Sequence, residues 1–562
     1  PRPAGQAREL ATVSEPLLSV SDLRVAFATE GGLVRAVDGV SFELAPGEVL
    51  AIVGESGSGK SVTAQTIVGL TRSPNARIEG SVRLDGVELI DAAESELRRV
   101  RGERIAMVFQ DPMTSFNPVY RIGRQLTEAT LALRPKTTRD EARAQAIELL
   151  GSVGLPDPER QVDRYPFELS GGMRQRAMIA MALMLEPEIL IADEPTTALD
   201  VTIQAQILEL LRRLNRERGL STILITHDFG VVAEMADRVL VMHEGEIVER
   251  GGLDDVFYSP RDPYTRKLLG AVVRLDRAPP LRPGRGAAPL LEVSGLVKHF
   301  PLKRGLLVDR EVDRVRAVDG VSFSVARGET LGLVGESGSG KSTLSRTVLQ
   351  LLEPTSGSVR FDGREIAGLS RRQMRPLRAR MQMVFQDPYS SLNPRKRIGQ
   401  IVGEPLRIQG ALSGRELRAR VQELLERVGL SAAHHQRYPH EFSGGQRQRI
   451  GIARALALEP KLVIADEPVS ALDVSIRAQI LDLMAELQDE FGLTYVFVAH
   501  DIGVVRHVSD RIAVMHDGKI VEQGPADEVC ERPSDPYTKQ LLAAVPVPDP
   551  REARARRASS AM

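Results

Sequence analysis

The sequence predicts two successive α/β domains, each built around a mostly parallel sheet. The chain has 562 residues, which exceeds the roughly 250 to 300 residues that one hydrophobic core usually serves. One set of motifs occurs twice in the same order, with Gly54 and Gly335 lying 281 residues apart and Asp193 and Asp466 lying 273 apart. Solenoid repeats are only about 20 to 50 residues long, so this period indicates a duplicated domain.

Each half has the same predicted order of elements. Apolar, β-branched stretches at 17–27 and 290–300 predict strands that open an antiparallel sheet. The wholly apolar runs at 189–192 and 462–465 are typical of parallel strands covered on both faces. Such strands alternate with helical stretches like 204–218, as in other α/β folds. The residues between Gln110 and Ser170 have helical character and predict a separate helical subdomain.

These patterns divide the chain into five segments. We expect an N-terminal tail at 1–15, a first domain at 16–275, a linker at 276–288, a second domain at 289–547 and an arginine-rich tail at 548–562. The linker is rich in Pro, Gly and Arg, which cannot build a core. The four arginines of the last segment could touch anionic lipid, but a solvated chain end is the simpler expectation.

Composition favours an ordinary globular protein, since 42% of residues are apolar and 27% are charged. The net charge of -1 argues against a general nucleic-acid surface. No run approaches the 18 or so uninterrupted apolar residues that span a bilayer, and residues 1–8 lack the apolar core of a secretory signal. A cytosolic location is expected. The single cysteine, Cys530, excludes a disulfide within the chain and a Cys-rich zinc site.

A phosphate-binding loop of the pattern Gly-x4-Gly-Lys-Ser occurs in each half. Glycines let backbone amides surround phosphate oxygens, Lys reaches the β- and γ-phosphates, and Ser binds Mg²⁺. Two copies in register make a chance match improbable. The predicted nucleotide-binding residues of these loops are Gly54, Ser56, Gly57, Gly59, Lys60, Ser61 and Val62, and Gly335, Ser337, Gly338, Gly340, Lys341, Ser342 and Thr343.

An Asp-Glu pair ends an apolar strand in each half, at Asp193-Glu194 and Asp466-Glu467. The Asp can hold Mg²⁺, while the Glu can polarise water for in-line attack on a γ-phosphate. Such pairs also occur as solvated strand ends, but the phosphate loop upstream makes that alternative weak. Glu194 and Glu467 are therefore predicted catalytic residues.

A glutamine follows another short apolar run in each half, at Gln110 and Gln386. Its amide can join the Ser and Asp in binding Mg²⁺. The predicted metal ligands are thus Ser61, Gln110 and Asp193 in the first half, and Ser342, Gln386 and Asp466 in the second.

A Ser-Gly-Gly motif precedes a helical stretch at Ser170, Gly171 and Gly172, and again at Ser443, Gly444 and Gly445. The turn exposes amides at a helix N-terminus, which makes a second anion site. With this motif the array resembles the ATP-binding-cassette (ABC) family over nearly the whole chain. The implied fold is two tandem ABC-type P-loop NTPase domains, each with a parallel-sheet core, an antiparallel β subdomain and a helical subdomain.

The resemblance implies a crossed arrangement in which the signature of each half closes over the nucleotide of the other. Lys60 and Glu194 would work with Ser443, Gly444 and Gly445, and Lys341 and Glu467 with Ser170, Gly171 and Gly172. It also implies that His227 and His500 contact the γ-phosphate, and that 198–200 and 471–473 connect the sites. Phe27 and Phe300 lie where the family stacks an aromatic ring on adenine, although core packing explains them equally well. Both Glu and both His are present, so we expect two hydrolytic sites.

A Pro-Tyr-Thr-x-x-Leu-Leu element follows each core, at 263–269 and 536–542. It is similar to the C-terminal extension of ATPases for oligopeptide, dipeptide and nickel uptake. The signatures at Met173 and Phe442 depart from the usual glutamine and leucine, and likewise resemble the two ATPase subunits of that subfamily. Many of those subunits have a cysteine segment after the tyrosine that can hold an iron-sulfur cluster. Cys530 precedes the tyrosine here, so no cluster is expected.

This resemblance implies the energy-coupling ATPase of a bacterial importer, using ATP and Mg²⁺. Its partners would be two transmembrane permease subunits and a substrate-binding protein on separate chains, and it would lie peripherally at the cytoplasmic face of the membrane. Dipeptides or oligopeptides are the expected cargo, with nickel or another small solute as the alternative. A soluble tandem ATPase acting on ribosomes or nucleic acid is less favoured, because the charged connector or zinc cysteines of those proteins are missing.

Overall fold

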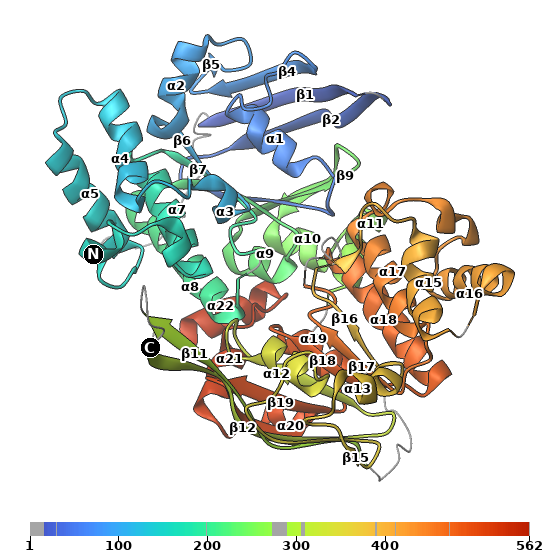
Figure 1. Cartoon of the computed structure of the whole chain (residues 1–562). Coiled ribbons are helices and arrows are strands. Elements are labelled where there is room, and N and C mark those ends of the chain that lie inside the picture. Colours follow the sequence, from blue (N-terminus) through green and yellow to red (C-terminus); the bar gives the residue numbers. More distant parts are fainter. Residues whose placement is uncertain are drawn as a thin grey trace, which may run out of the picture. The chain divides into compact units, whose positions relative to one another are not determined.

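The computed structural model describes residues 16–29, 31–197, 199–272, 289–304, 310–387, 391–410, 412–470 and 472–560. Contacts divide the chain into two compact units (Figure 1). Unit 1 comprises Pro1–Leu199, Gln206–Gly270 and Pro546–Met562, and unit 2 comprises Asp200–Ala205 and Ala271–Val545. The predicted tail at 1–15 and linker at 276–288 lie outside the described residues.

Unit 1 opens with a four-stranded sheet in the order β2-β1-β4-β5, of which the β1–β2, β1–β4 and β4–β5 pairs are antiparallel. Its strands are β1 (Leu18–Thr29), β2 (Gly32–Leu44), β4 (Ala76–Leu84) and β5 (Val87–Glu88). The alternation of buried and exposed side chains along β1 shifts near Asp22. There φ is 48° and the pairing register is irregular. Leu18 and Val20 before this bulge and Leu23 and Val25 after it are all buried. The bulge keeps both halves of the strand facing one core.

The second sheet of unit 1 has six strands in the order β10-β9-β3-β8-β7-β6. Every pair is parallel except β9–β10. All residues of β3, β7 and β8 are buried, as the apolar runs at 49–53, 189–192 and 223–225 predict. Its strands are β3 (Val49–Val53), β6 (Ile105–Val108), β7 (Ile189–Asp193), β8 (Ser221–Thr226), β9 (Arg238–His243) and β10 (Glu246–Gly252).

The predicted helical subdomain of unit 1 is confirmed. Helices α4 (Ile122–Leu133), α5 (Arg139–Ser152) and α7 (Gly171–Leu183) pack on one another (Figure 1). Thr138 and Glu141 form a capping box at the start of α5, which satisfies two orphan amides of that helix. The remaining helices are α1 (Lys60–Ile67), α2 (Glu94–Glu103), α3 (Pro112–Ser115), α6 (Pro158–Gln161), η1 (Pro166–Glu168), α8 (Val201–Arg218), α9 (Phe229–Met235), α10 (Leu253–Tyr258) and α11 (Pro263–Gly270).

Unit 2 repeats this architecture. Its four-stranded sheet has the order β12-β11-β14-β15 and its six-stranded sheet the order β16-β17-β18-β13-β19-β20. The strands are β11 (Pro289–Arg304), β12 (Arg310–Ala326), β13 (Thr330–Val334), β14 (Ser356–Phe361), β15 (Arg364–Glu365), β16 (Met381–Val384), β17 (Leu462–Asp466), β18 (Thr494–Ala499), β19 (Arg511–His516) and β20 (Lys519–Pro525).

The helices of unit 2 include α15 (Ile398–Gln409), α16 (Gly414–Arg427) and α17 (Gly444–Leu456), which form its helical subdomain. The others are α12 (Lys341–Val348), α13 (Arg371–Arg378), η2 (Ala432–Gln436), η3 (Pro439–Glu441), α18 (Val474–Phe491), α19 (Ile502–Val508), α20 (Ala526–Glu531) and α21 (Pro536–Ala543). No helix of the described ranges is long and apolar enough to cross a bilayer.

Three arginines of the C-terminal segment are exposed, as the sequence suggests, but the segment also packs on unit 1. It forms helix α22 (Pro550–Ser560), which packs on α9 and α10 within unit 1. Tyr258 donates a hydrogen bond to the Asp549 carboxylate at 2.7 Å. Arg554 donates to both carboxylate oxygens of Asp254, at 2.7 and 2.8 Å, and Ala553 is buried. Composition alone could not predict this, because the partners Asp254 and Tyr258 lie some 300 residues earlier in the chain.

We expect Arg554→Glu to loosen α22 from unit 1, because it places a carboxylate beside Asp254. Exposed ion pairs are worth about 0.2 to 1 kcal/mol, so limited proteolysis should release the C-terminal helix roughly two to five times faster. Combining Arg554→Glu with Asp254→Arg reverses the pair and should restore the wild-type rate. Equal rates for the single variant and wild type would show that this ion pair does not hold the helix.

Candidate nucleotide site

The loop between β3 and α1 has a backbone that only glycine allows at two positions. Gly54 and Gly59 have φ of 156° and 99°. A Cβ on Gly54 would lie 2.2 Å from the Met242 carbonyl oxygen, and one on Gly59 would lie 2.4 Å from the Ala36 carbonyl oxygen. The backbone at these positions therefore passes against neighbouring backbone, whereas Ser56 and Gly57 form the exposed tip of the loop. Amides arranged around such a tip are suited to binding phosphate.

The side chains that follow this loop are anchored to it and to β7. The Lys60 ammonium donates hydrogen bonds to the Gly54 and Glu55 carbonyl oxygens, each at 2.8 Å. The Ser61 hydroxyl donates to the Asp193 carboxylate at 3.0 Å. The predicted partners of phosphate and Mg²⁺ are thus brought together at the carboxyl end of β3 and β7, where ligands bind in open α/β sheets.

The other predicted residues of the first site contact Glu194. Its carboxylate accepts a hydrogen bond from the Gln110 amide at 2.7 Å and one from the Thr197 hydroxyl at 2.8 Å. Nδ1 of His227 lies 3.1 Å from Glu194 Oε1. Glu194 has φ of 47°, an uncommon backbone conformation that occurs at functional sites. Sequence alone gives no sign that Thr197 belongs to this set.

The second site repeats the first with nearly the same distances. Lys341 donates to the Gly335 and Glu336 carbonyl oxygens at 2.7 and 2.8 Å. The Ser342 hydroxyl donates to Asp466 at 3.0 Å. The second set also includes Gln386 donating to Glu467 at 2.8 Å and His500 Nδ1 at 3.4 Å from the Glu467 carboxylate. Every predicted member is present in both halves, whereas Ser470 stands at the place of Thr197 and its hydroxyl donates to the Glu467 carbonyl oxygen.

The two neighbouring carboxyl groups have pKa values shifted in opposite directions. Burial raises the pKa of Asp193 to about 6, although the Ser61 hydrogen bond opposes this shift. Burial also raises the pKa of Glu194, but the hydrogen bond and charge of His227 and the Thr197 hydrogen bond outweigh it, so the pKa falls to about 2. Asp466 and Glu467 are shifted in the same two directions. Environments that separate the pKa values of paired acids are typical of catalytic sites.

Asp193→Asn should stabilise the chain when Mg²⁺ and nucleotide are absent. The folded-state pKa of Asp193 is raised to about 6, so the folded state holds this proton longer than the unfolded state does, and stability falls as pH rises from about 4 to 6. Asparagine removes that loss, a gain on the order of 1 to 3 kcal/mol above pH 6. Thermal melts in EDTA should show a Tm difference that grows over this interval and is constant above it. An equal difference at pH 4.5 and 7.5 would contradict this assignment.

A tyrosine of each C-terminal extension also belongs to the site. The Tyr264 hydroxyl accepts a hydrogen bond from the Glu55 amide at 3.2 Å, and Tyr537 accepts one from the Glu336 amide at 3.0 Å. Burial raises the pKa of Tyr537 to about 12. The sequence marks these tyrosines only as part of a subfamily element, whereas the structure places them against the phosphate loops.

The remaining predicted residues lie elsewhere in their own units. Ser170 and Ser443 cap α7 and α17, where each hydroxyl accepts a hydrogen bond from the third amide of its helix. Phe27 is half-buried on β1 against the core, and Phe300 is 37% exposed with Lys298 5.1 Å from its ring centre. Val62 and Thr343 are half-buried in α1 and α12, and each carbonyl accepts a threonine hydroxyl of the next turn. Ala198 and Ala471 lie outside the described residues.

The residues present fit a magnesium nucleotide. Ser61 and Asp193 already meet through oxygen atoms, and Mg²⁺ prefers one or two carboxylates together with substrate phosphates and water. The described ranges contain no group of three or more His, Cys, Asp or Glu side chains that could hold a metal ion. Protein side chains of these types therefore do not form a complete metal site in those ranges. The phosphates would supply the remaining ligands.

Comparison with known proteins finds two family models, each matched twice. The ABC transporter model matches residues 37–197 and 318–470. The model described as "Oligopeptide/dipeptide transporter, C-terminal region" matches residues 248–294 and 521–561. The two ranges matched by this C-terminal-region model include Tyr264 and Tyr537, and the later range also includes α22.

Curated relatives resemble the chain over almost its full length. It is 51% identical over 573 residues to "Glutathione import ATP-binding protein GsiA" of Salmonella choleraesuis (strain SC-B67), covering 97% of this chain and 92% of that protein. It is 50% identical over 570 residues to the protein of that name in Escherichia coli (strain K12), covering 96% and 91%. A solved structure of cbiO1 from Clostridium perfringens is 31% identical, with a TM-score of 0.40 over 48% of this chain and 99% of that one.

Proposed function

Because this chain belongs to the ABC transporter family and carries the oligopeptide/dipeptide transporter C-terminal region twice, we propose that it hydrolyses ATP at two sites to drive the uptake of short peptides. The chain is the ATP-hydrolysing subunit of a peptide-type importer. The observation that carries the finer proposal is the contact of a Gln and a His with both Glu194 and Glu467.

Each site has a base, a phosphate anchor and a metal anchor within one cluster. Lys60 and Lys341 hold the loop and can reach the β- and γ-phosphates, and Mg²⁺ held at Ser61 or Ser342 would neutralise charge that develops on the phosphates. Glu194 and Glu467 are ionised at neutral pH because of their lowered pKa values, so they can accept a hydrogen bond from an attacking water. His227 and His500 orient these carboxylates and, in the proposal, contact the γ-phosphate.

We also propose the crossed pairing of signature motifs with the opposite phosphate loops. Its support comes from the segment after β7, since residues 200–205 belong to unit 2. There the Asp200 carboxylate accepts a hydrogen bond from the Ser337 amide at 2.5 Å, and Thr202 donates to Glu336. A segment of the first repeat thus contacts the phosphate loop of the second within one unit. Neither repeat is then expected to hydrolyse ATP efficiently by itself.

Short peptides, with glutathione among them, are the proposed cargo. The C-terminal region supports peptides as a class, and the name of the relatives supports glutathione, which is a tripeptide. Two permease subunits and a substrate-binding protein on other chains would contact the cargo, and the chain would sit peripherally on the permeases at the cytoplasmic face. Nickel or another small solute is the second candidate, because the resemblance of the Pro-Tyr-Thr-x-x-Leu-Leu element extends to nickel uptake.

Uptake assays in a strain lacking this chain test the proposal. Labelled glutathione, a dipeptide, a longer peptide and nickel should be compared in cells complemented with wild type or with Glu194→Gln/Glu467→Gln. We expect peptide uptake to return only with wild type. Uptake of nickel alone would favour the second candidate, and uptake unaffected by the deletion would contradict an importer role. The proposal includes no iron-sulfur cluster, which an iron signal from the pure protein would contradict.

A further inference from the structure

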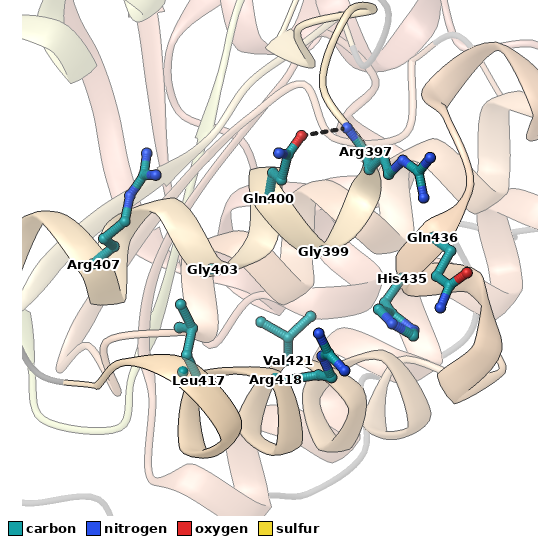
Figure 2. A pocket seen from close by; sticks show the side chains of 11 residues that line it. Arg397, Gly399, Gln400, Gly403, Arg407, Leu417, Arg418, Val421, His435 and Gln436 are labelled. Carbon is teal, nitrogen blue, oxygen red and sulfur yellow. Dashed lines mark hydrogen bonds between the residues drawn. The ribbon is translucent and has the colours of Figure 1, made fainter.

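A cavity of about 370 Å³ lies in the helical subdomain of unit 2, between α15, α16 and η2 (Figure 2). Eleven residues line it and none of them is acidic. Arg397, Arg418, His435 and Gln436 lie around one end of the cavity, whereas Arg407 lies at the other. Leu417 is half-buried along the cavity wall, whereas Val421 and Gly403 are buried beneath it and pack on each other. The site therefore combines a cationic end with an apolar floor.

The first repeat shows what this cationic end lacks. There the Asp163 carboxylate accepts two hydrogen bonds from Arg143, at 3.0 and 2.8 Å, and lies 3.8 Å from Arg121. This bidentate pair raises the pKa of Arg143 and lowers that of Asp163. One carboxylate thus neutralises both arginines inside unit 1.

One backbone hydrogen bond and one side-chain contact match between the repeats. The Ile122 amide donates to the Arg164 carbonyl oxygen at 2.9 Å, and the Ile398 amide donates to the Arg437 carbonyl oxygen at 2.9 Å. Arg121 lies 5.9 Å from the ring centre of Tyr165, and Arg397 lies 5.6 Å from that of Tyr438. In this register Arg397 and Gln436 occupy the places of Arg121 and Asp163. Arg418 matches Arg143 because each is the fifth residue of its helix, α16 or α5.

The second repeat therefore keeps both arginines and replaces their carboxylate by the neutral Gln436. Within the described part of the chain, no carboxylate lies within ion-pair distance of Arg397 or Arg418. Arg407 differs, because it lies 3.9 Å from Glu404. Guanidinium groups bind carboxylates in a two-pronged geometry, and the first repeat shows that this frame accepts one.

We propose that this cavity binds a carboxylate side chain from a cytoplasmic segment of a permease subunit, which supplies what Asp163 supplies internally in the first repeat. The inference rests on the proposed importer function and adds the chemistry of one partner contact. A free small anion would use only the cationic end, whereas a protein segment with an Asp or Glu also covers the half-buried Leu417. The two halves of the chain would then dock permeases differently, with only the second half requiring an acidic partner residue.

Gln436→Asp tests this directly, because it inserts the carboxylate of the first repeat. The matched control is Gln436→Asn, which adds no charge. From cells that express the whole importer, a tagged Gln436→Asp chain should retain permease subunits at least about fivefold less than wild type, since a charged contact is lost. Gln436→Asn should match wild type. Basal ATPase of the isolated chain should be the same in all three. Equal permease retention by the Asp and Asn variants would overturn the proposal.

A photo-reactive residue at position 436 identifies the occupant. We expect a cross-link to a permease segment that carries Asp or Glu near the linked position, and reversal of that acid to Arg should restore retention by Arg418→Glu. A cross-link to a basic or neutral segment, to a second copy of this chain, or to no protein would overturn the proposal. If the wild-type chain retains no permease at all, the proposed importer function is contradicted as well. If permease retention does not depend on residue 436, only the role of the cavity is contradicted.

Discussion

The double variant Glu194→Gln/Glu467→Gln should lose at least about 100-fold in ATP turnover, because removing a general base typically costs about 100- to 10,000-fold. Glutamine keeps the shape of the side chain and one oxygen acceptor, so the contacts of Gln110 and Thr197 with residue 194 can be partly retained. It cannot hold the negative charge that orients water. ATP binding, measured with a fluorescent analogue, should therefore remain close to wild type.

The two single variants distinguish ATP sites that work independently from ATP sites that are coupled. Each should keep about half of the wild-type turnover if the sites work independently, and almost none if one site cannot cycle without the other. A matched control is Glu209→Gln, which changes an exposed glutamate on α8 and should leave the rate unchanged. Full activity in both single variants would contradict the assignment of Glu194 and Glu467 as catalytic residues.

The fold could be predicted from the sequence because its signals are local. Continuous apolar runs at β7 and β17 predict buried parallel strands, and both strands are entirely buried. The residue sets around Glu194 and Glu467 could be assembled because each member ends a strand or starts a helix of a known motif. Parallel strands bring their carboxyl ends to one edge of the sheet, so order along the chain was sufficient to expect the cluster.

Contacts between distant segments could not be predicted in this way. Tyr264 lies 209 residues from the Glu55 amide to which it is bonded, and Arg554 lies 300 residues from Asp254. A hydroxyl or a guanidinium in an ordinary helical stretch gives no sign of its acceptor. The asymmetry between Asp163 and Gln436 has the same character. A single change from Asp to Gln in a polar segment becomes informative only when both arginines are placed around it.

Gly340→Ala should abolish nucleotide binding at the second phosphate loop and lower ATP turnover by about 100-fold or more, since a displacement near 1 Å at a catalytic site can have that effect. The new Cβ would lie 1.9 Å from the Ala317 carbonyl oxygen and 2.8 Å from Met515 Cε. Since ordinary contacts begin near 3.4 Å, the backbone must shift by more than 1 Å. Lys341 and Ser342 follow directly in the chain and would move with it.

Gly363→Ala is the matched control. Gly363 also has a positive φ, 76° against 104° for Gly340, but a Cβ there meets nothing within 4 Å. Both variants incur the left-handed backbone cost of about 1 to 2 kcal/mol, and only Gly340→Ala adds the clash with Ala317. If both variants lowered Tm equally and Gly340→Ala still bound nucleotide, backbone strain alone would explain why glycine is needed at position 340. The close approach to Ala317 would then not be needed to explain it. If Gly340→Ala lost binding while Gly363→Ala kept it, the tight packing of this loop would be the feature on which phosphate recognition depends.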